Sequence, residues 1–481
     1  MRRAIPLLPL LLAASPSLAE DLAPRLRAGL VRVEVTAQPY DATTPWNKQS
    51  PRAVAGRGFV VEPGVVLTTA ANVKDAVLLE LSVANSARRY PAGLKHADAR
   101  SGLALLEIED AEFAASLAPL EIGDPVKLDD DFDIYQVGND NTVERSTGRV
   151  VRADANGAQL TLHLKTTCSD PGTGQVALRG GKVAGLLAAT VPNRQEGTLL
   201  SVETIRRYLD DFRDGTFHGA PGGGIWIQQL LRPDLRAYYG LQPGQHGIAV
   251  SRVMPGRTGD GSVRAGDVIL SVDGYALDDE GKFDHEVHGR LGSIYLFQGR
   301  RCAGDKVPVR LLREGAERDA ELELKAWPDE EQRVPQSADG RPVFLVVAGL
   351  VILELTQDVA AEIRRSTGGV ILRRYRERAA WDLPDGRHRI VYMDRVLADR
   401  ANKGYEEAGP AVVESVNGRP ITRISDVAEA LTTPQGAFHV IRFEGTVADF
   451  AVEAAKLAEI DARIAAAYKV ALPRWLKGDA E

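Results

Sequence analysis

Residues 56–73 read GRGFVVEPGVVLTTAANV and decide the fold of the N-terminal half. Two apolar, β-branched runs flank a Pro-Gly turn, which predicts a β-hairpin. Similar short runs, separated by Gly, Asp and Asn turns, recur at 31–35, 78–83, 103–108, 134–137, 160–164 and 183–187. Short strands at such spacing predict a barrel or a sandwich. Residues 201–212 then predict a helix capped by Ser201.

Three motifs, in chain order, resemble those of the trypsin-like HtrA/Deg serine proteases. Residues 67–71 (LTTAA) correspond to Leu-Thr-x-Ala-His, so Ala71 takes the place of the general base. Residues 102–106 (GLALL) correspond to Asp-Leu-Ala-Leu-Leu, so Gly102 replaces the carboxylate. Residues 171–176 (PGTGQV), which precede 182–185 (KVAG), correspond to Pro-Gly-Asn-Ser-Gly-Gly before its following strand, with one residue fewer over the whole segment, so the serine position falls at Gly174 or in the gap. The resemblance implies a mainly β chain with a trypsin-like double β-barrel and a degenerate catalytic triad.

Triad chemistry needs a hydroxyl nucleophile, an imidazole and a carboxylate. Ala71 and Gly102 supply neither of the last two, and loss of a triad costs about 10⁶ in turnover. We therefore expect no catalytic residues. Two substitute arrangements are considered, a Thr173 hydroxyl beside the Asn72 amide, and Cys168 with His163 or His96. The alternative for the whole protein is an active serine endopeptidase of the HtrA/Deg family acting in protein quality control.

Residues 223–326 resemble a Deg-type PDZ domain, most clearly at 265–274 (AGDVILSVDG). Such domains hold a peptide carboxylate on backbone amides of a Gly-containing turn, and the following strand pairs with the peptide. Carried over, the turn is Gly223 and Gly224, and the strand is Ile225, Trp226 and Ile227. The alternative is that the glycines at 222–224 are only linker.

Residues 341–453 resemble the second PDZ domain of the plant-type Deg subgroup, at 344–351, 391–399 and 416–418, and the run 343–355 is predicted to be extended. Residues 454–481 form an Ala-rich helical tail. The resemblance implies a homo-oligomer, a trimer or a multiple of trimers. The full division is 1–19 signal peptide, 20–214 barrel domain, 215–222 linker, 223–326 first PDZ domain, 327–340 linker, 341–453 second PDZ-like domain and 454–481 tail.

The N-terminus has the three parts of a cleavable secretory signal: Arg2-Arg3, an apolar run at 4–14 and Ser17-Leu18-Ala19. We expect a periplasmic or secreted protein without a membrane span. A net charge of −7 argues against nucleic acid as a partner. No motif indicates a metal or another cofactor. Cys168 and Cys302 either pair or remain two buried thiols.

These observations together predict an exported, non-catalytic HtrA/Deg-like protein with a scaffold, chaperone-like or regulatory role. It would bind peptides or unfolded segments through its first PDZ domain.

Overall fold

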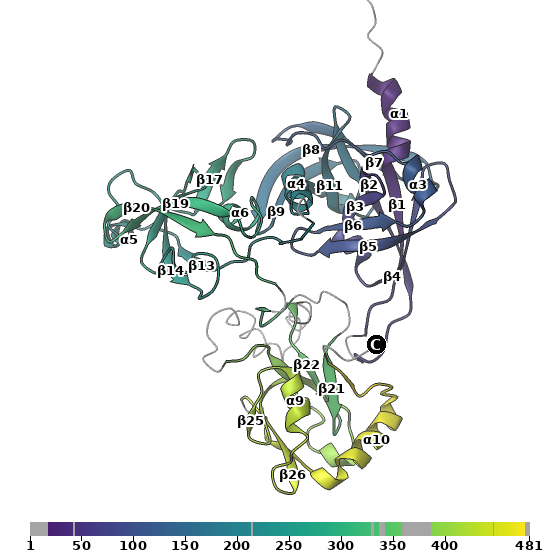
Figure 1. Ribbon diagram of the computed structural model, residues 1–481, viewed down its shortest axis with the longest axis vertical. Helices are drawn as coiled ribbons and strands as arrows, with labels where there is room; N and C mark the ends of the chain where they lie inside the picture. The colour runs from purple at the N-terminus through teal and green to yellow at the C-terminus, as the bar shows by residue number, and fades with distance from the viewer. Residues whose placement is uncertain are drawn as a thin grey trace, which may run out of the picture.

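The computed structural model describes residues 18–41, 44–212, 215–328, 331–335, 342–357, 359, 386–445 and 447–476. These residues form three units (Figure 1): a double barrel (18–212), a middle unit (215–328) and a C-terminal unit (331–476). Almost all of the predicted signal peptide, 1–17, lies outside the described residues. In the described part of the chain, no helix is long and apolar enough to cross a membrane.

The double barrel consists of two closed six-stranded barrels, as the sequence predicts. The first barrel has the order β1-β2-β3-β6-β5-β4 and comprises β1 (Leu30–Ala37), β2 (Arg52–Glu62), β3 (Val65–Thr69), β4 (Ala76–Val83), β5 (Tyr90–Asp98) and β6 (Leu103–Ile108). The second has the order β10-β11-β12-β9-β8-β7 and comprises β7 (Asp131–Val137), β8 (Val143–Asn156), β9 (Gln159–Thr166), β10 (Val176–Arg179), β11 (Lys182–Val191) and β12 (Glu196–Ser201). The short helices are α1 (Leu18–Gly29), α2 (Ala70–Val73), α3 (Ala111–Ser116), η1 (Pro192–Arg194) and α4 (Val202–Asp210).

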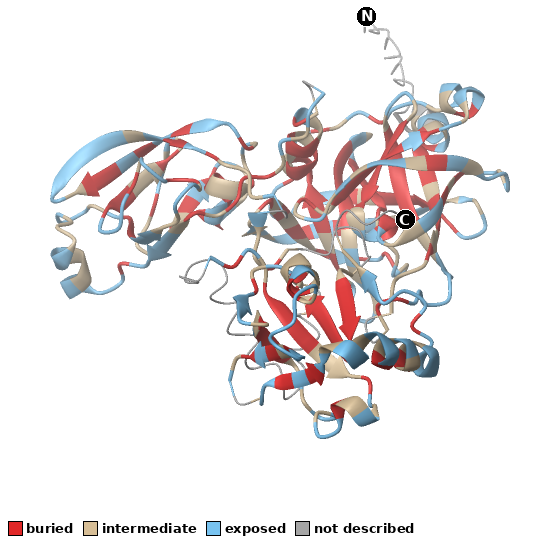
Figure 2. Cartoon of the chain, turned by 60° about the horizontal axis from the view of Figure 1, so that its bottom comes forward, coloured by how far each residue is buried: buried red, intermediate tan, exposed pale blue. Residues whose placement is uncertain are grey.

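Alternating apolar residues build each barrel around its own core. On β1, Val31, Val33 and Val35 are buried, and the residues between them are partly exposed. The predicted N-cap of α4 is confirmed, because the Ser201 side chain accepts a hydrogen bond from the Thr204 N–H. Figure 2 shows the buried residues concentrated inside each unit.

The middle unit is a PDZ-like sheet that packs against the second barrel. Its main sheet has the order β13-β14-β15-β19-β20, with β16 paired to β15, and β17 pairs with β18. Its elements are β13 (Ile225–Gln228), α5 (Pro233–Tyr238), β14 (Ile248–Val253), β15 (Val268–Val272), β16 (Tyr275–Ala276), β17 (Lys282–His285), β18 (Gly289–Gly292), α6 (Ile294–Gln298), β19 (Lys306–Arg313) and β20 (Ala316–Glu323). Leu160 of the barrel lies in the core of this unit, and Glu203 on α4 lies 2.6 Å from the His288 ring. The segment 215–222 is held as well, because Arg100 donates to the carbonyls of Ala220 and Pro221.

The C-terminal unit is a second β sheet, with the order β27-β26-β24-β23-β22-β21-β28 and β25 paired to β24. Its elements are β21 (Phe344–Val347), β22 (Leu350–Glu354), β23 (Val391–Val396), η3 (Arg400–Asn402), β24 (Ala411–Val416), β25 (Arg419–Pro420), α9 (Ile424–Ala430), β26 (Phe438–Phe443), β27 (Phe450–Glu453), η4 (Ala454–Lys456), α10 (Leu457–Tyr468) and β28 (Arg474–Trp475). The run 343–355 is not one strand but a hairpin, because Ala348 and Gly349 turn the chain with φ values of 47° and 89°.

Residues 454–476, which the sequence analysis set apart as a helical tail, contribute to this C-terminal unit. Ile460 and Ile464 on α10 belong to its hydrophobic core. The strand β28 pairs with β21, where Trp475 lies opposite Phe344. The apolar face of α10 is therefore covered by the sheet.

The loop between β1 and β2 joins the first barrel to the C-terminal unit. Trp46 in this loop is only 9% exposed and lies in the same hydrophobic core as Phe344 and Val334. The rings of Trp46 and Phe344 have centroids 6.1 Å apart, within the range of favourable aromatic pairs. The first barrel thus supplies part of the core of the C-terminal unit.

Trp46→Ala is expected to destabilise the C-terminal unit by about 3 kcal/mol, because it removes a buried aromatic side chain from that core. Urea unfolding followed by circular dichroism measures the change. Leu78→Ala, at a side chain in the first barrel that is 49% exposed, is the control and should change stability by less than about 0.5 kcal/mol. Equal effects of the two substitutions on the free energy of unfolding would contradict the inference that Trp46 stabilises the core of the C-terminal unit.

Candidate functional site

A hydroxyl and an amide meet where the two barrels join. Asn72 comes from α2 in the first barrel, and Thr173 comes from the loop between β9 and β10 in the second. The Thr173 hydroxyl donates to Asn72 Oδ1 over 2.8 Å, and Asn72 Nδ2 donates to the Thr173 carbonyl over 3.1 Å. Thr69 Oγ1 lies 2.8 Å from the same hydroxyl. These are the described hydrogen bonds of the Thr173 hydroxyl, and no histidine is among its described partners.

An ion pair supports the loop that carries Thr173. The side chain of Arg57 is 2% exposed, and its Nη2 lies 2.7 Å from Asp170 Oδ2. Burial lowers the pKa of Arg57, and the nearby Asp170 carboxylate opposes that shift. Asp170 Oδ1 also accepts the N–H of Gly172 over 2.7 Å, while the N–H of Arg57 donates to the Thr173 carbonyl over 2.9 Å. The loop is therefore fixed by hydrogen bonds on both sides of Thr173.

The structure places the three predicted triad positions around this junction. Ala71 is exposed on α2, and the N–H of its neighbour Ala70 donates to the Gly102 carbonyl over 2.9 Å. Gly174 has φ of +92°, and a Cβ there would lie 1.9 Å from the Arg57 carbonyl oxygen. No side chain fits at Gly174, so the hydroxyl adjacent to that position is that of Thr173.

The alternative Cys/His pair is not brought together. Cys168 is buried, and burial raises the pKa of its thiol. His163 lies 3.0 Å from Arg152, and the His96 ring lies 3.0 Å from the Tyr208 hydroxyl. Cys168 and Cys302 are both free thiols, and Cys302 is only partly buried. No cluster of metal-ligating side chains occurs among the described residues.

A polar cavity of about 350 Å³ is lined by the part of this loop that ends at Pro171, two residues before Thr173. Its walls include the loop residues 167–171 and side chains from the β7–β8 hairpin, among them Gln136, Glu144 and Arg145. It is large enough to accept an extended side chain.

The glycines before β13 are packed rather than forming a free linker. A Cβ on Gly222 would lie 2.4 Å from Trp327 Cβ, and one on Gly224 would lie 2.4 Å from the Thr258 carbonyl oxygen. The Gly222 N–H donates to the Lys325 carbonyl over 2.8 Å. This backbone therefore has a defined course into β13.

The strand β13 lies at one end of the main sheet and pairs with β14 on one side. No other strand of the described chain pairs with it. The side chains of Trp226 and Ile227 on β13 are 38% and 42% exposed. An edge strand with exposed apolar side chains is a surface to which an extended peptide can add as a further strand.

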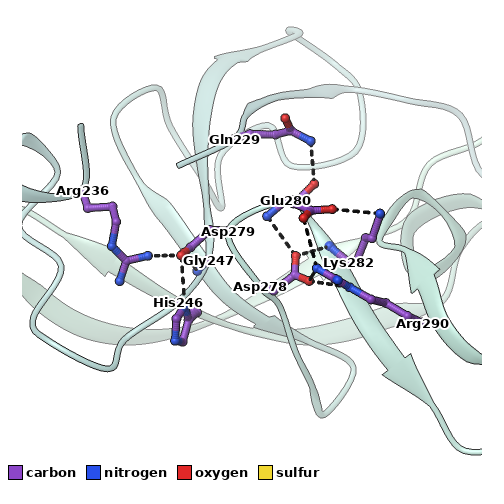
Figure 3. A network of polar contacts seen from close by, with 9 residues as sticks. All are labelled: Gln229, Arg236, His246, Gly247, Asp278, Asp279, Glu280, Lys282 and Arg290. Atoms are coloured by element: carbon purple, nitrogen blue, oxygen red, sulfur yellow. Dashed lines mark hydrogen bonds and ion pairs between the residues drawn. The ribbon is translucent and has the colours of Figure 1, made fainter. Parts of the chain in front are cut away.

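A network of charged residues fixes the far end of β13 (Figure 3). Gln229 donates to the Glu280 carbonyl over 2.9 Å, which ties the strand to the loop at 278–280. In that loop Asp278 accepts hydrogen bonds from the N–H of Lys282 and from Arg290. Asp279 pairs with Arg236 and with the His246 ring. The network therefore holds the strand in place.

Comparisons with known proteins agree with this architecture. Residues 56–186 match the trypsin-like peptidase domain, and residues 334–474 match the PDZ domain. The chain is 27% identical over 430 residues to Protease Do-like 2, chloroplastic, of Arabidopsis thaliana, covering 86% of this chain and 69% of that protein. It is 24% identical over 415 residues to a probable periplasmic serine endoprotease DegP-like of Marinomonas sp. (strain MWYL1), covering 83% and 78%. Among solved structures, the HtrA-type protease AlgW with decapeptide is 16% identical with a TM-score of 0.47, covering 65% of this chain and 99% of that one.

A trypsin-like double barrel, a middle β sheet and a C-terminal PDZ domain are the architecture of a trypsin-like peptidase that carries a PDZ domain. The relatives along most of the chain are Do-like and DegP-like proteases, which supports the HtrA/Deg family.

The comparisons contradict the expectation of a non-catalytic binding protein. The relatives that align with more than four-fifths of the chain are named as proteases, including Protease Do-like 2 and the DegP-like serine endoprotease. The expectation of inactivity rested on Ala71, Gly102 and Gly174 at the three triad positions, and no finding shows inactivity. The alternative, a peptidase, agrees better with these names.

Asp278→Asn is expected to destabilise the middle unit by roughly 1–2 kcal/mol at pH 7. Burial acts to raise the pKa of Asp278, but hydrogen bonds from Lys282 N–H, Arg290 and Glu280 N–H outweigh it, and the pKa is lowered. A lowered carboxyl pKa in the folded state gives stability that is present above the unfolded value of about 3.9 and is lost as the pH falls further. The difference between the two proteins should therefore shrink below about pH 4.

Urea unfolding at pH 7, 5, 4 and 3 measures this difference. Asp284→Asn, at an exposed position on β17, is the control and should change stability little at any pH. A gap between wild type and Asp278→Asn that stays constant down to pH 3 would rule out the ionised carboxylate as its source.

Proposed function

We propose that this protein is an HtrA/Deg-type endopeptidase that acts on polypeptides, with the Thr173 hydroxyl as its nucleophile. The observation that carries the proposal is the hydrogen bond of this hydroxyl to Asn72 across the barrel junction. The names of the relatives support it, because they describe proteases along most of the chain. The polar cavity lined by loop residues 167–171 would accept a substrate side chain.

The residues around Thr173 determine how fast such a reaction can run. The hydroxyl oxygen would attack the peptide carbonyl, and Asn72 would orient it. An amide cannot take up the hydroxyl proton near neutral pH, so hydroxide from solvent would accept it. The C–N bond would then break as water protonates the leaving amine, and a further water would hydrolyse the Thr173 ester and free the hydroxyl. Ala71 and Gly102 stand where the family has its base and its carboxylate. We therefore expect turnover about 10⁶ below that of an intact triad, rising roughly tenfold per pH unit.

The middle unit would supply the substrate to the barrels. The turn at Gly223 and Gly224 would bind a C-terminal carboxylate through backbone amides, and Ile225, Trp226 and Ile227 would pair with the extended peptide. A single site of this kind would bind with a Kd of about 1 μM, or roughly −8 kcal/mol.

Export and assembly belong to the same proposal. The bacterial relatives are named as periplasmic, and residues 1–19 have the pattern of a cleavable signal, so we place the mature protein in the periplasm or outside the cell. A homo-oligomer, either a trimer or a multiple of trimers, would raise the effective concentration of several weak peptide sites.

Thr173→Ala is expected to abolish cleavage of unfolded casein, because it removes the nucleophile. Thr173→Ser should retain cleavage, since it keeps the hydroxyl. Ser116→Ala is the control, because Ser116 is an exposed hydroxyl on α3 of the first barrel, outside the cavity, and it should leave the rate unchanged. Fluorescent casein assayed between pH 7 and 9.5, with intact mass spectrometry after a fluorophosphonate probe, gives both readouts.

Ala71→His tests the missing base directly. Ala71 is exposed, so an imidazole there has room, and it should raise cleavage at pH 8 by at least tenfold. Two outcomes would refute Thr173 as the nucleophile. One is that Thr173→Ala cleaves casein as fast as the wild type does, and the other is that the wild type shows neither cleavage nor labelling at any pH.

Trp226→Ala is expected to weaken binding of a peptide with a hydrophobic C-terminus by about tenfold, or roughly 1.4 kcal/mol, because it removes an aromatic contact beside β13. Fluorescence anisotropy with a labelled peptide measures the Kd. Tyr238→Ala, at a side chain of the same unit that is 80% exposed, should leave the Kd unchanged. Equal Kd values for wild type and Trp226→Ala would move the peptide site away from β13.

A further inference from the structure

The helix α4 carries an arginine that is buried and has no partner. Arg207 is 5% exposed. Its Nε, Nη1 and Nη2 atoms lack hydrogen-bond partners in the part of the chain that the structure describes. An unpaired buried charge costs several kcal/mol. A group of this kind therefore requires a specific explanation, and an ion is one of the usual ones.

Arg207 lines a cavity of about 730 Å³ between the second barrel and the middle unit. Tyr295 and Cys302 of the middle unit line it from the opposite side. The guanidinium is close enough to influence both groups: burial raises the pKa of the Cys302 thiol to about 11, and the charge of Arg207 counteracts part of that rise. The charge of Arg207 acts in the same direction on the Tyr295 hydroxyl, whose pKa burial also raises. Arg207 thus lies on the wall of a cavity formed by two units.

The carboxylates around the cavity are engaged elsewhere. Glu203 pairs with His288 over 2.6 Å. Asp211 accepts from His218 and from the Gly219 N–H, and Asp305 accepts from the Cys302 N–H. Asp210 also has an interaction of its own. None of these carboxylates is hydrogen-bonded to Arg207 in the described structure.

The other three arginines of the cavity also have partners. Arg300 and Arg301 both pair with Asp273. Arg206 donates to the Gly123 carbonyl and lies 3.9 Å from Asp124. Among the arginines that line the cavity, Arg207 is the one whose described guanidinium atoms all remain available for a ligand.

We propose that this cavity binds a small phosphate-type oxyanion, with Arg207 as its anchor. The planar guanidinium presents two parallel N–H donors that match the oxygen atoms of such an anion. The volume lies in the usual range of roughly 300–1,000 Å³ for small-molecule sites. Arg300 and Arg301 add positive potential at the same cavity, and the Tyr295 hydroxyl offers a further donor.

The site would couple the middle unit to the barrel. Arg207 belongs to the barrel helix α4, whereas Tyr295 and Cys302 belong to the middle unit. An anion held between them would favour the docked arrangement by mass action, because its site is complete only when both units are in place.

Isothermal titration calorimetry of the purified full chain with inorganic phosphate tests the proposal. The ionic strength is held constant with sodium chloride, and acetate, a monovalent carboxylate, is titrated as the comparison anion. Phosphate should bind with a Kd below 1 mM. Arg207→Gln should weaken binding at least tenfold, whereas Arg149→Gln, at an exposed side chain on β8 outside the cavity, should change it less than twofold. Glu203→Gln should tighten binding, because it removes a competing negative charge one helical turn away.

Alkylation of Cys302 in the wild type gives a second readout that does not depend on the folding of a variant. Phosphate should slow maleimide labelling of Cys302 at least threefold, with the buried Cys168 as the internal reference. Absence of phosphate binding, binding unchanged in a folded Arg207→Gln, or tighter binding of acetate than of phosphate would each overturn the proposal. None of these outcomes depends on peptidase activity, so they are distinguishable from a failure of the proposed function.

Discussion

The side chain of Asn72 joins the two barrels, and polar groups around it form the hydrogen bonds that its buried amide requires. It is 4% exposed, and a buried amide left without partners would cost about 1–3 kcal/mol per group. Its Nδ2 donates to Thr68 and to the Thr173 carbonyl, and its Oδ1 accepts from the Thr173 hydroxyl. A Cβ at Gly56 would lie 2.3 Å from Asn72 Cγ. Residues distant in sequence are thereby bound to one another.

The same constraint shapes the chemistry of the junction. The amide that secures the two barrels also holds the hydroxyl of Thr173, so structure and candidate chemistry share one side chain. An amide orients a hydroxyl but does not accept its proton. The Gly172 N–H, which could otherwise face a developing oxyanion, donates to Asp170 instead. The junction thus favours a well-ordered loop over rapid proton transfer.

Much of the fold could be predicted from sequence, because apolar alternation marks β1 and a short continuous apolar run marks β3. The strand β8 escaped prediction because its exposed positions are dense in polar residues, including Glu144, Arg145 and Arg149, and its partners β7 and β9 are set by barrel closure. From the sequence alone no catalytic residues are expected, and the Thr173 hydroxyl beside Asn72 is considered only as a substitute arrangement. The exclusion of a side chain at Gly174 depends on the position of the Arg57 carbonyl, a tertiary contact that no local pattern encodes. The unpartnered state of Arg207 likewise depends on two units that meet only in the folded chain.

The indole of Trp46 has a consequence for how this architecture can be rearranged. The C-terminal unit follows the middle unit in the chain, yet part of its interior comes from the loop between β1 and β2, roughly 300 residues earlier. A truncation after residue 335 would leave a large aromatic ring in water, and the excised unit would have a hole in its interior. The barrel and the C-terminal unit therefore cannot be exchanged independently. Recombination between homologues would preserve the core only where the β1–β2 loop and the C-terminal unit come from the same parent.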